Sequence, residues 1–167
     1  MSEALIGQLA ECLGELRGLY EQLVGVLRRK LEAMRRADTE GLNSCGARER
    51  FLVQRMAESD ATRRNLVGEL QVRAGVRAGQ AMTLSDLAER LGEPARSRVL
   101  VLAAGLRQVV EEANQLNQVA ALSAKEMLVH FGRVYEVMQS GGMGGGVYGP
   151  QGGRAQTAER RSLDAVG

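Results

Sequence analysis

Few side chains in this sequence could do chemistry, and the first to consider is its single histidine, His130. A histidine acting as a general base needs a nucleophile and an orienting carboxylate nearby, and no pattern in the sequence supplies either. His130 falls on an apolar helical repeat, which favours a neutral or partly exposed histidine packed against its neighbours. The acidic pair Glu111 and Glu112 has no matching carboxylate pattern, so we expect it on a solvated helix face. The sequence predicts no catalytic residues and no enzyme.

Two cysteines, Cys12 and Cys45, raise the question of a disulfide or a metal site. If the chain reverses near residue 37, Cys12 lies 25 residues before the reversal and Cys45 lies 8 residues after it. Because a helix rises 1.5 Å per residue, the 17-residue difference separates them by roughly 25 Å, which is beyond disulfide reach. The sequence also lacks a CxxC pair and a second histidine for zinc. We therefore expect two small buried hydrophobic side chains, no metal and no cofactor.

A glycine-rich stretch, residues 141–153, is a candidate phosphate-binding loop. Such loops follow a strand, carry a Lys-Ser/Thr pair and lead into a helix. This stretch follows a predicted helix and has no Lys-Ser/Thr pair. Its composition is typical of a flexible linker.

A helix-turn-helix motif is the strongest competing interpretation. Residues 83–92 resemble its first helix and turn, and a recognition helix would begin near Pro94 with Arg96 and Arg98 facing DNA. Two observations oppose this interpretation. The helix that begins at Pro94 continues to about residue 139 as a packing surface, and the formal net charge of the chain is only +2. No segment has the basic excess that a nucleic-acid partner requires, so none is expected.

The elements that carry these residues are predicted to be helices. The sequence is 44% hydrophobic but only 3% aromatic, without tryptophan, which disfavours a β-sandwich or barrel. Leucines at helical spacing predict a first helix over 5–34. Asp38 or Thr39 can cap a second helix over about 39–76. A third long helix is predicted over 94–139.

The third long helix carries an apolar seam with alternating spacings of three and four. About six such heptads specify a helix roughly 65–70 Å long, with a seam that neighbouring helices must cover. The first two helices are the obvious cover. We therefore predict an all-α fold, an elongated antiparallel bundle of three long helices with a short connecting helix and a flexible C-terminal tail. The seam positions are Val99, Leu102, Leu106, Val109, Ala113, Leu116, Ala120, Ser123, Met127, His130, Val134 and Val137.

Three regions are expected: a helical bundle over 1–140, the glycine-rich linker over 141–153, and a flexible partner-binding tail over 154–167. The sparse apolar residues of the tail cannot offset the entropy of ordering it, so we expect it to be disordered until a partner binds. The N-terminus is acidic and no apolar signal segment follows. The longest apolar run, 99–104, is too short to cross a bilayer. Together with the two cysteines, this favours a cytoplasmic protein without membrane insertion.

Two short motifs carry a family resemblance. Asn114 and Asn117 form an NxxN pattern on the last long helix, and residues 148–152 read Tyr-Gly-Pro-Gln-Gly, a Tyr-Gly-x-x-Gly pattern. Together with the leucine-rich first helix and the charged-to-apolar run at 48–52, these motifs resemble the FlgN family of flagellar export chaperones. The glycine-rich insertion and the 83–92 segment depart from the family pattern.

The resemblance implies a type III export chaperone with a role in flagellum biogenesis. Such chaperones bind the C-terminal regions of hook-associated proteins at the hook–filament junction, prevent their premature assembly and deliver them to the export apparatus. It also implies that client binding involves the C-terminal region, which here contains Val147, Tyr148, Leu163 and Val166.

Asn114 and Asn117 fall just off the seam, and two interpretations stay open for them. They are either a polar flank that bonds to water and neighbouring backbone, or a specificity mark in a client groove. Two rival functions also stay open. One is a DNA-binding regulator that uses residues 83–99, and the other is a generic coiled-coil scaffold. The sequence leaves homodimerisation undecided.

Overall fold

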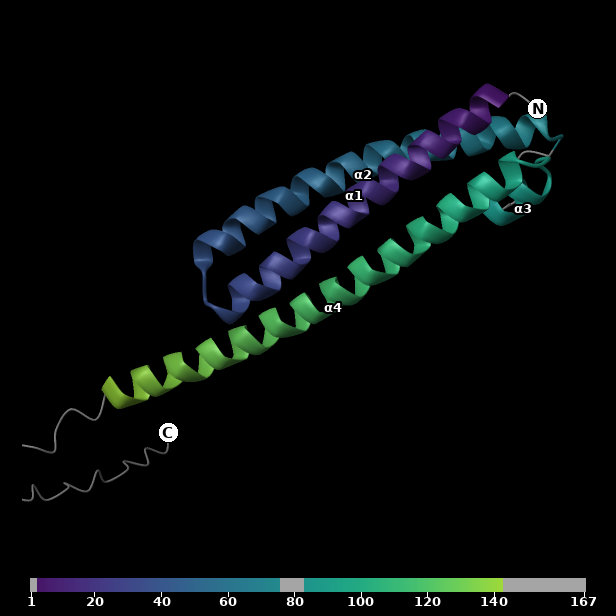
Figure 1. Ribbon diagram of the computed structural model, residues 1–167. Coiled ribbons are helices and arrows are strands. Elements are labelled where there is room, and N and C mark those ends of the chain that lie inside the picture. Colours follow the sequence, from purple (N-terminus) through teal and green to yellow (C-terminus); the bar gives the residue numbers. More distant parts are fainter. Residues whose placement is uncertain (1–2, 76–82, 143–167) are drawn as a thin grey trace, which may run out of the picture. The chain divides into compact units, whose positions relative to one another are not determined.

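The computed structural model describes residues 3–75 and 83–142 (Figure 1). The predicted all-α fold is confirmed, because these residues contain helices and no strand. The predicted linker from residue 143 on and the predicted tail, 154–167, lie outside the described residues. The helices are α1 (Glu3–Arg35), α2 (Thr39–Arg73), α3 (Leu84–Glu89) and α4 (Ala95–Gly142).

The chain divides into two compact units, residues 1–126 and 127–167. The first unit contains α1, α2, α3 and α4 as far as Glu126. In the second unit, the described residues are the remainder of α4. The first unit holds the hydrophobic core, and the second holds most of the exposed apolar side chains discussed below.

A tight reversal joins α1 to α2. Ala37 adopts a left-handed conformation with a φ of 52°. The side chain of Asp38 then accepts a hydrogen bond of 2.9 Å from the backbone N–H of Gly41. This bond satisfies one of the donors left free in the first turn of a helix. The prediction that Asp38 or Thr39 caps the second helix is confirmed, with Asp38 as the cap.

The reversal makes α1 and α2 antiparallel. Lys30, near the end of α1, forms an ion pair of 2.7 Å with Glu49 of α2. Near the start of α1, the thiol of Cys12 donates to the carbonyl oxygen of Ser59 at 3.3 Å. Cys12 and Cys45 are free thiols with exposed fractions of 5% and 9%. The prediction that they are buried side chains is confirmed.

The first part of α4 packs on α1 and runs in the same direction. Val99 belongs to a buried cluster with Leu9, and further along Ala113 belongs to one with Leu27. Residue numbers therefore rise together along the two helices. Because α2 runs the opposite way, the three long helices form the antiparallel up-down-up arrangement that was predicted.

The short helix α3 closes one end of this bundle. The hydroxyl of Thr83 accepts from the backbone N–H of Asp86 at 3.1 Å, and the Asp86 carboxylate accepts from the backbone N–H of Thr83 at 2.9 Å. This capping box fixes the start of a helix that would be marginal in isolation. Leu87, Ala88 and Leu91 are buried against α1, α2 and α4, so α3 is anchored by its apolar face.

The seam of α4 is covered over only part of its length. Val99, Ala113 and Ala120 are buried, whereas Val134 is 42% and Val137 69% exposed. The prediction that the first two helices cover the whole seam is therefore wrong for its last positions.

The register of α1 and α4 within the first unit follows from one of these clusters. Leu27 and Ala113 lie at the same level, so Arg35, eight residues further along α1, reaches about the level of Ala121 on α4. His130, predicted to be a partly exposed residue packed against its neighbours, is exposed.

Candidate partner-binding surface

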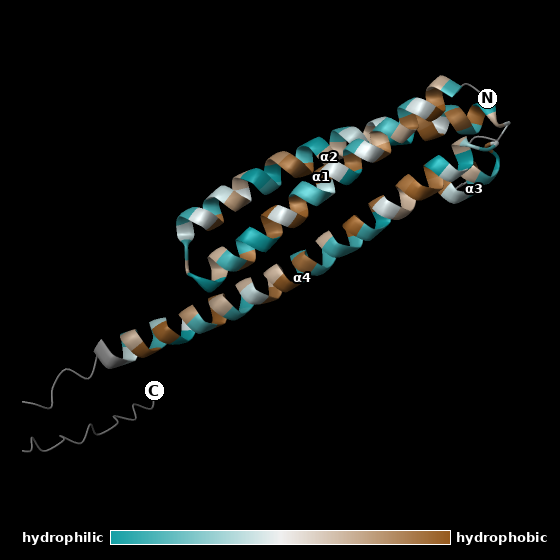
Figure 2. Cartoon of the chain, in the orientation of Figure 1, coloured by the Kyte–Doolittle hydropathy of each residue, from teal (hydrophilic) through white to brown (hydrophobic). Residues whose placement is uncertain are grey.

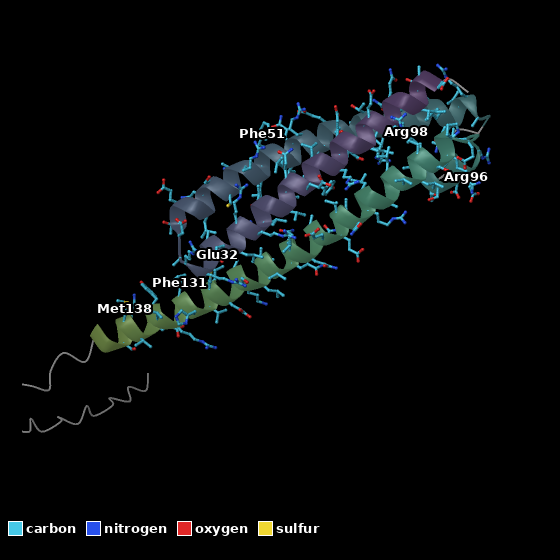
Figure 3. The ribbon with its side chains drawn as sticks, viewed as in Figure 1. Glu32, Phe51, Arg96, Arg98, Phe131 and Met138 are labelled. Carbon is cyan, nitrogen blue, oxygen red and sulfur yellow. The ribbon has the colours of Figure 1, made fainter. Side chains whose placement is uncertain are left out.

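Exposed large apolar side chains are concentrated on the second half of α4. Hydrophobic and hydrophilic residues alternate along this helix (Figure 2). Leu128, Phe131, Tyr135 and Met138 are 73%, 59%, 64% and 72% exposed. Their spacings of three, four and three residues place them on one face of the helix. We call these four residues the α4 apolar stripe; Figure 3 labels Phe131 and Met138.

The last seam positions lie beside this stripe. Met127, His130, Val134 and Val137 follow the same spacing, one residue out of step with the stripe. At about 100° per residue, the two rows together span roughly half of the helix circumference. A two-helix coiled coil needs only a narrow seam, so this arc is wide enough to contact more than one partner segment.

Polar groups of this segment are satisfied locally. The side-chain amide of Gln139 donates to the Tyr135 hydroxyl at 2.6 Å, and the Ser140 hydroxyl donates to the carbonyl oxygen of Glu136 at 2.8 Å. Both hydrogen bonds are made within the helix itself. A contiguous exposed apolar surface of this kind typically marks a protein-protein interaction site.

The predicted site residues fall into two groups. Asn114 and Asn117 are exposed on α4 within the first unit, consistent with their positions off the seam. Val147, Tyr148, Leu163 and Val166 lie outside the described residues, so their role in binding stays a prediction.

Sequence reasoning missed the α4 apolar stripe. Its signal was present in the sequence, because Leu128, Phe131, Tyr135 and Met138 repeat at helical spacing. The seam beside the stripe has the same period over a much longer range, and it therefore dominated the interpretation of this helix.

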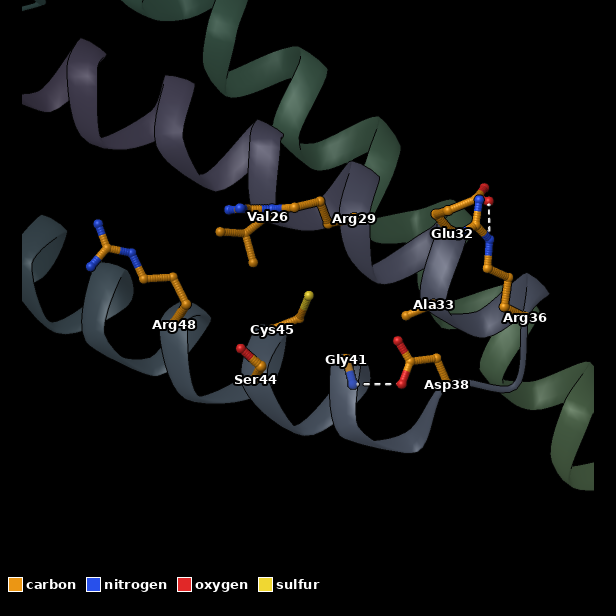
Figure 4. A pocket seen from close by; sticks show the side chains of 10 residues that line it. All are labelled: Val26, Arg29, Glu32, Ala33, Arg36, Asp38, Gly41, Ser44, Cys45 and Arg48. Atoms are coloured by element: carbon orange, nitrogen blue, oxygen red, sulfur yellow. Dashed lines mark hydrogen bonds and ion pairs between the residues drawn. The ribbon is translucent and has the colours of Figure 1, made fainter.

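A cavity of about 640 Å³ lies between α1 and α2 beside their reversal (Figure 4). Arg29, Arg36 and Arg48 line it, which raises the question of an anion site. The guanidinium of Arg36 lies 2.8 Å from the carboxylate of Glu32, and Arg48 donates to the side chain of Gln22 at 2.7 Å. Two of the three cations are thus held by partners within the protein, and we assign no chemistry to this cavity.

The remaining chemical candidates gain no support. Within residues 3–75 and 83–142, no group of histidine, cysteine or acidic residues is arranged to hold a metal ion. No helix of this part of the chain is long and apolar enough to span a membrane. The pKa of Asp86 is lowered, mainly by the hydrogen bond from the Thr83 hydroxyl, which is a capping interaction.

The geometry of residues 83–99 also disfavours a DNA-reading head. Arg96 and Arg98 are exposed, as the helix-turn-helix interpretation requires (Figure 3). However, Leu87 and Val99 are fully buried in the core of the bundle, so this segment is a packed part of it. The carboxylate of Glu93 accepts from the Ser97 hydroxyl at 2.7 Å beside the two arginines. A negative charge at that place opposes phosphate binding.

Comparison with known proteins identifies the family. The model of the FlgN protein family matches residues 1–156, which include all four helices. Comparison with curated proteins gives no match, and comparison with solved structures gives none either. The family match agrees with the resemblance carried by the NxxN and Tyr-Gly-x-x-Gly motifs, and with the helical bundle. The chain belongs to the FlgN family of flagellar export chaperones.

Proposed function

We propose that this protein is a cytoplasmic chaperone of flagellar type III export whose clients are hook-associated proteins. It binds their C-terminal regions, keeps them unassembled and delivers them to components of the export apparatus. Family membership supports the chaperone role. The observation that carries the proposal is the α4 apolar stripe, four large apolar side chains that are each more than half exposed.

The stripe suits a client that is amphipathic. A protein segment that packs only in the finished hook–filament junction exposes an apolar face while it is unassembled. Leu128, Phe131, Tyr135 and Met138 repeat at the spacing of helical anchor residues, and they can cover such a face by helix-to-helix packing. Because the neighbouring seam positions widen the apolar arc, a second client segment, or the chain's own tail, can pack beside the first.

The C-terminal tail contributes further contacts to the client in this proposal. Val147, Tyr148, Leu163 and Val166 supply apolar contacts to the client, while Asn114 and Asn117 contribute specificity. When a segment becomes ordered only on binding, the entropy lost in ordering it lowers the net affinity, which keeps the complex reversible. Reversibility is what a delivery chaperone requires.

Co-elution with a hook-associated protein tests the proposal. The full-length chain is compared with a chain that ends at Ser140, which keeps the stripe but lacks the linker and tail. The proposal predicts unchanged helicity by circular dichroism and sharply reduced binding by the truncated chain. Equal binding by both chains would remove the tail from the mechanism, and no binding by either would refute the proposed clients.

A further inference from the structure

A second apolar surface lies in the first unit. It is a cleft of about 340 Å³ between α2 and α4. Leu16 and Tyr20 of α1 form its floor, Met56 of α2 lines one wall, and Leu106 of α4 lines the other. We call this space the α1 cleft.

The cleft exists because α2 and α4 pack on different sides of α1. One buried cluster joins α1 to α2 through Val26 and Leu52, and another joins α1 to α4 through Leu27 and Ala113. Tyr20 and Leu23 pack against both clusters. Over this length each outer helix is held by α1, which leaves a position where a four-helix bundle would carry another helix.

The adjoining part of the bundle shows what fits between α2 and α4. There α3 contributes Leu87 and Ala88 to a cluster that also contains Leu70 of α2 and Val99 of α4. Leu84, Leu87 and Ala88 of α3 follow the helical spacing i, i+3 and i+4, and Leu91, just after α3, joins the same cluster. The cleft begins at the first residues of α3. Its surface is therefore continuous with one that already binds a short amphipathic helix.

The charges at the rim favour an acidic flank on the occupant. Arg63 lines the cleft and is neutralised by Asp60, with 2.8 Å between the guanidinium and the carboxylate. Arg107 on the opposite wall is exposed and has no ion-pair partner in the described part of the chain. A carboxylate on a bound helix would pair with Arg107 as the helix docks.

We propose that the α1 cleft binds one amphipathic helix of the client. The helix lies between α2 and α4 next to α3, inserts large aliphatic or aromatic side chains over Leu16 and Tyr20, and presents an acidic residue to Arg107. This inference rests on the proposed function, because the helix belongs to the client. It adds a binding site separate from the α4 apolar stripe.

Filling the cleft with a side chain tests the inference. Ala103 lines the cleft and is half-buried, whereas its neighbour Ala104 is exposed and does not line it. Ala103→Phe should weaken binding of a purified C-terminal fragment of a hook-associated protein by about tenfold or more, because an anchor pocket is blocked. Ala104→Phe introduces the same side chain and should leave the dissociation constant, measured by fluorescence anisotropy, within about twofold. Equal affinities of the two variants would overturn the inference.

A surface variant tests the inference even if Ala103→Phe misfolds. Arg107→Glu changes only an exposed residue and should also weaken fragment binding, whereas Lys125→Glu on the same helix should not. Photo-cross-linking supplies a direct readout, with benzoylphenylalanine placed at Ser85, an exposed residue that lines the cleft, or at Ala104, which does not line it. The inference predicts cross-links to a single client helix from position 85 only.

The outcomes separate the two proposals. If the fragment binds the full chain but position 85 gives no client cross-link, the cleft inference is overturned and the proposed function stands. Cross-links between two copies of the chain from position 85 would also overturn it, since the occupant is then a second copy. If the fragment does not bind the unaltered chain at all, both proposals fall.

Discussion

Replacing two residues of the α4 apolar stripe by serine should strongly weaken client binding without unfolding the protein. Leu128 and Phe131 are 73% and 59% exposed, so the fold gains little from them. We expect Leu128→Ser with Phe131→Ser to change the free energy of unfolding by less than about 0.5 kcal/mol per residue, as is usual for surface substitutions.

The expected loss of binding follows from the exposed area. Full burial of such a side chain contributes roughly 1.5–3 kcal/mol. Scaled by the exposed fractions of Leu128 and Phe131, each loses roughly 1–2 kcal/mol of binding free energy and the pair roughly 2–4 kcal/mol. At about 1.4 kcal/mol per tenfold, the dissociation constant of a hook-associated protein should rise by about 30- to 700-fold.

Isothermal titration calorimetry with the full-length chain measures this constant, and thermal unfolding by circular dichroism checks the fold. Val72→Ser is the matched control, because Val72 is 72% exposed on α2, outside the stripe. It should leave both measurements unchanged. If the double variant binds the client as tightly as the unaltered chain, the stripe is not the client surface. If it unfolds, Leu128 and Phe131 stabilise the fold despite their exposure.

Three further predictions concern the fold. Leu87→Ala removes a fully buried side chain from the core, so the free energy of unfolding measured by urea titration should fall by about 2–5 kcal/mol. Hydrogen bonds from Thr83 hold the pKa of Asp86 below its ordinary 3.8, so the cap should persist at that pH and above, and be lost only as the pH falls further through the lowered pKa. The acid-induced shift of the Asp86 amide proton should disappear in Asp86→Asn. A Cβ at Gly132 meets no atom within 4 Å, so Gly132→Ala should slow hydrogen exchange of α4 around it about fivefold. Gly14→Ala on α1, where an added Cβ also meets no atom within 4 Å, should leave hydrogen exchange around Gly132 unchanged.

Local signals in the sequence predicted most of the fold. The residue types at the first turn were informative, because Asp38, predicted as a possible cap, does cap α2. Periodic leucines placed α1 and the buried part of α4 to within a few residues. These features depend on interactions between near neighbours in the chain, which a sequence displays directly.

The candidate surface could not be predicted in the same way. Periodicity shows that a face of α4 is apolar, but it does not show which residues have a neighbour to cover them. That depends on the register between helices, set here by contacts such as Leu27 with Ala113. The sequence pattern at Val134 and Val137 is the same as at Val99, yet only Val99 is buried.

The register also separates the part of α4 that stabilises the fold from the part that is available to a partner. Clusters around Leu9, Leu27 and Val99 supply the core of the first unit. The stripe contributes no residue to any buried cluster of the described chain. Packing within the described chain therefore does not constrain these side chains. Contact with a partner can instead decide which residue types occur at these positions. Large apolar residues occupy four positions on one face of the helix, although packing does not require them and exposure favours polar ones. An exposed apolar surface of this kind typically marks a binding site, so the stripe is the first place to test the chaperone's contact with its client.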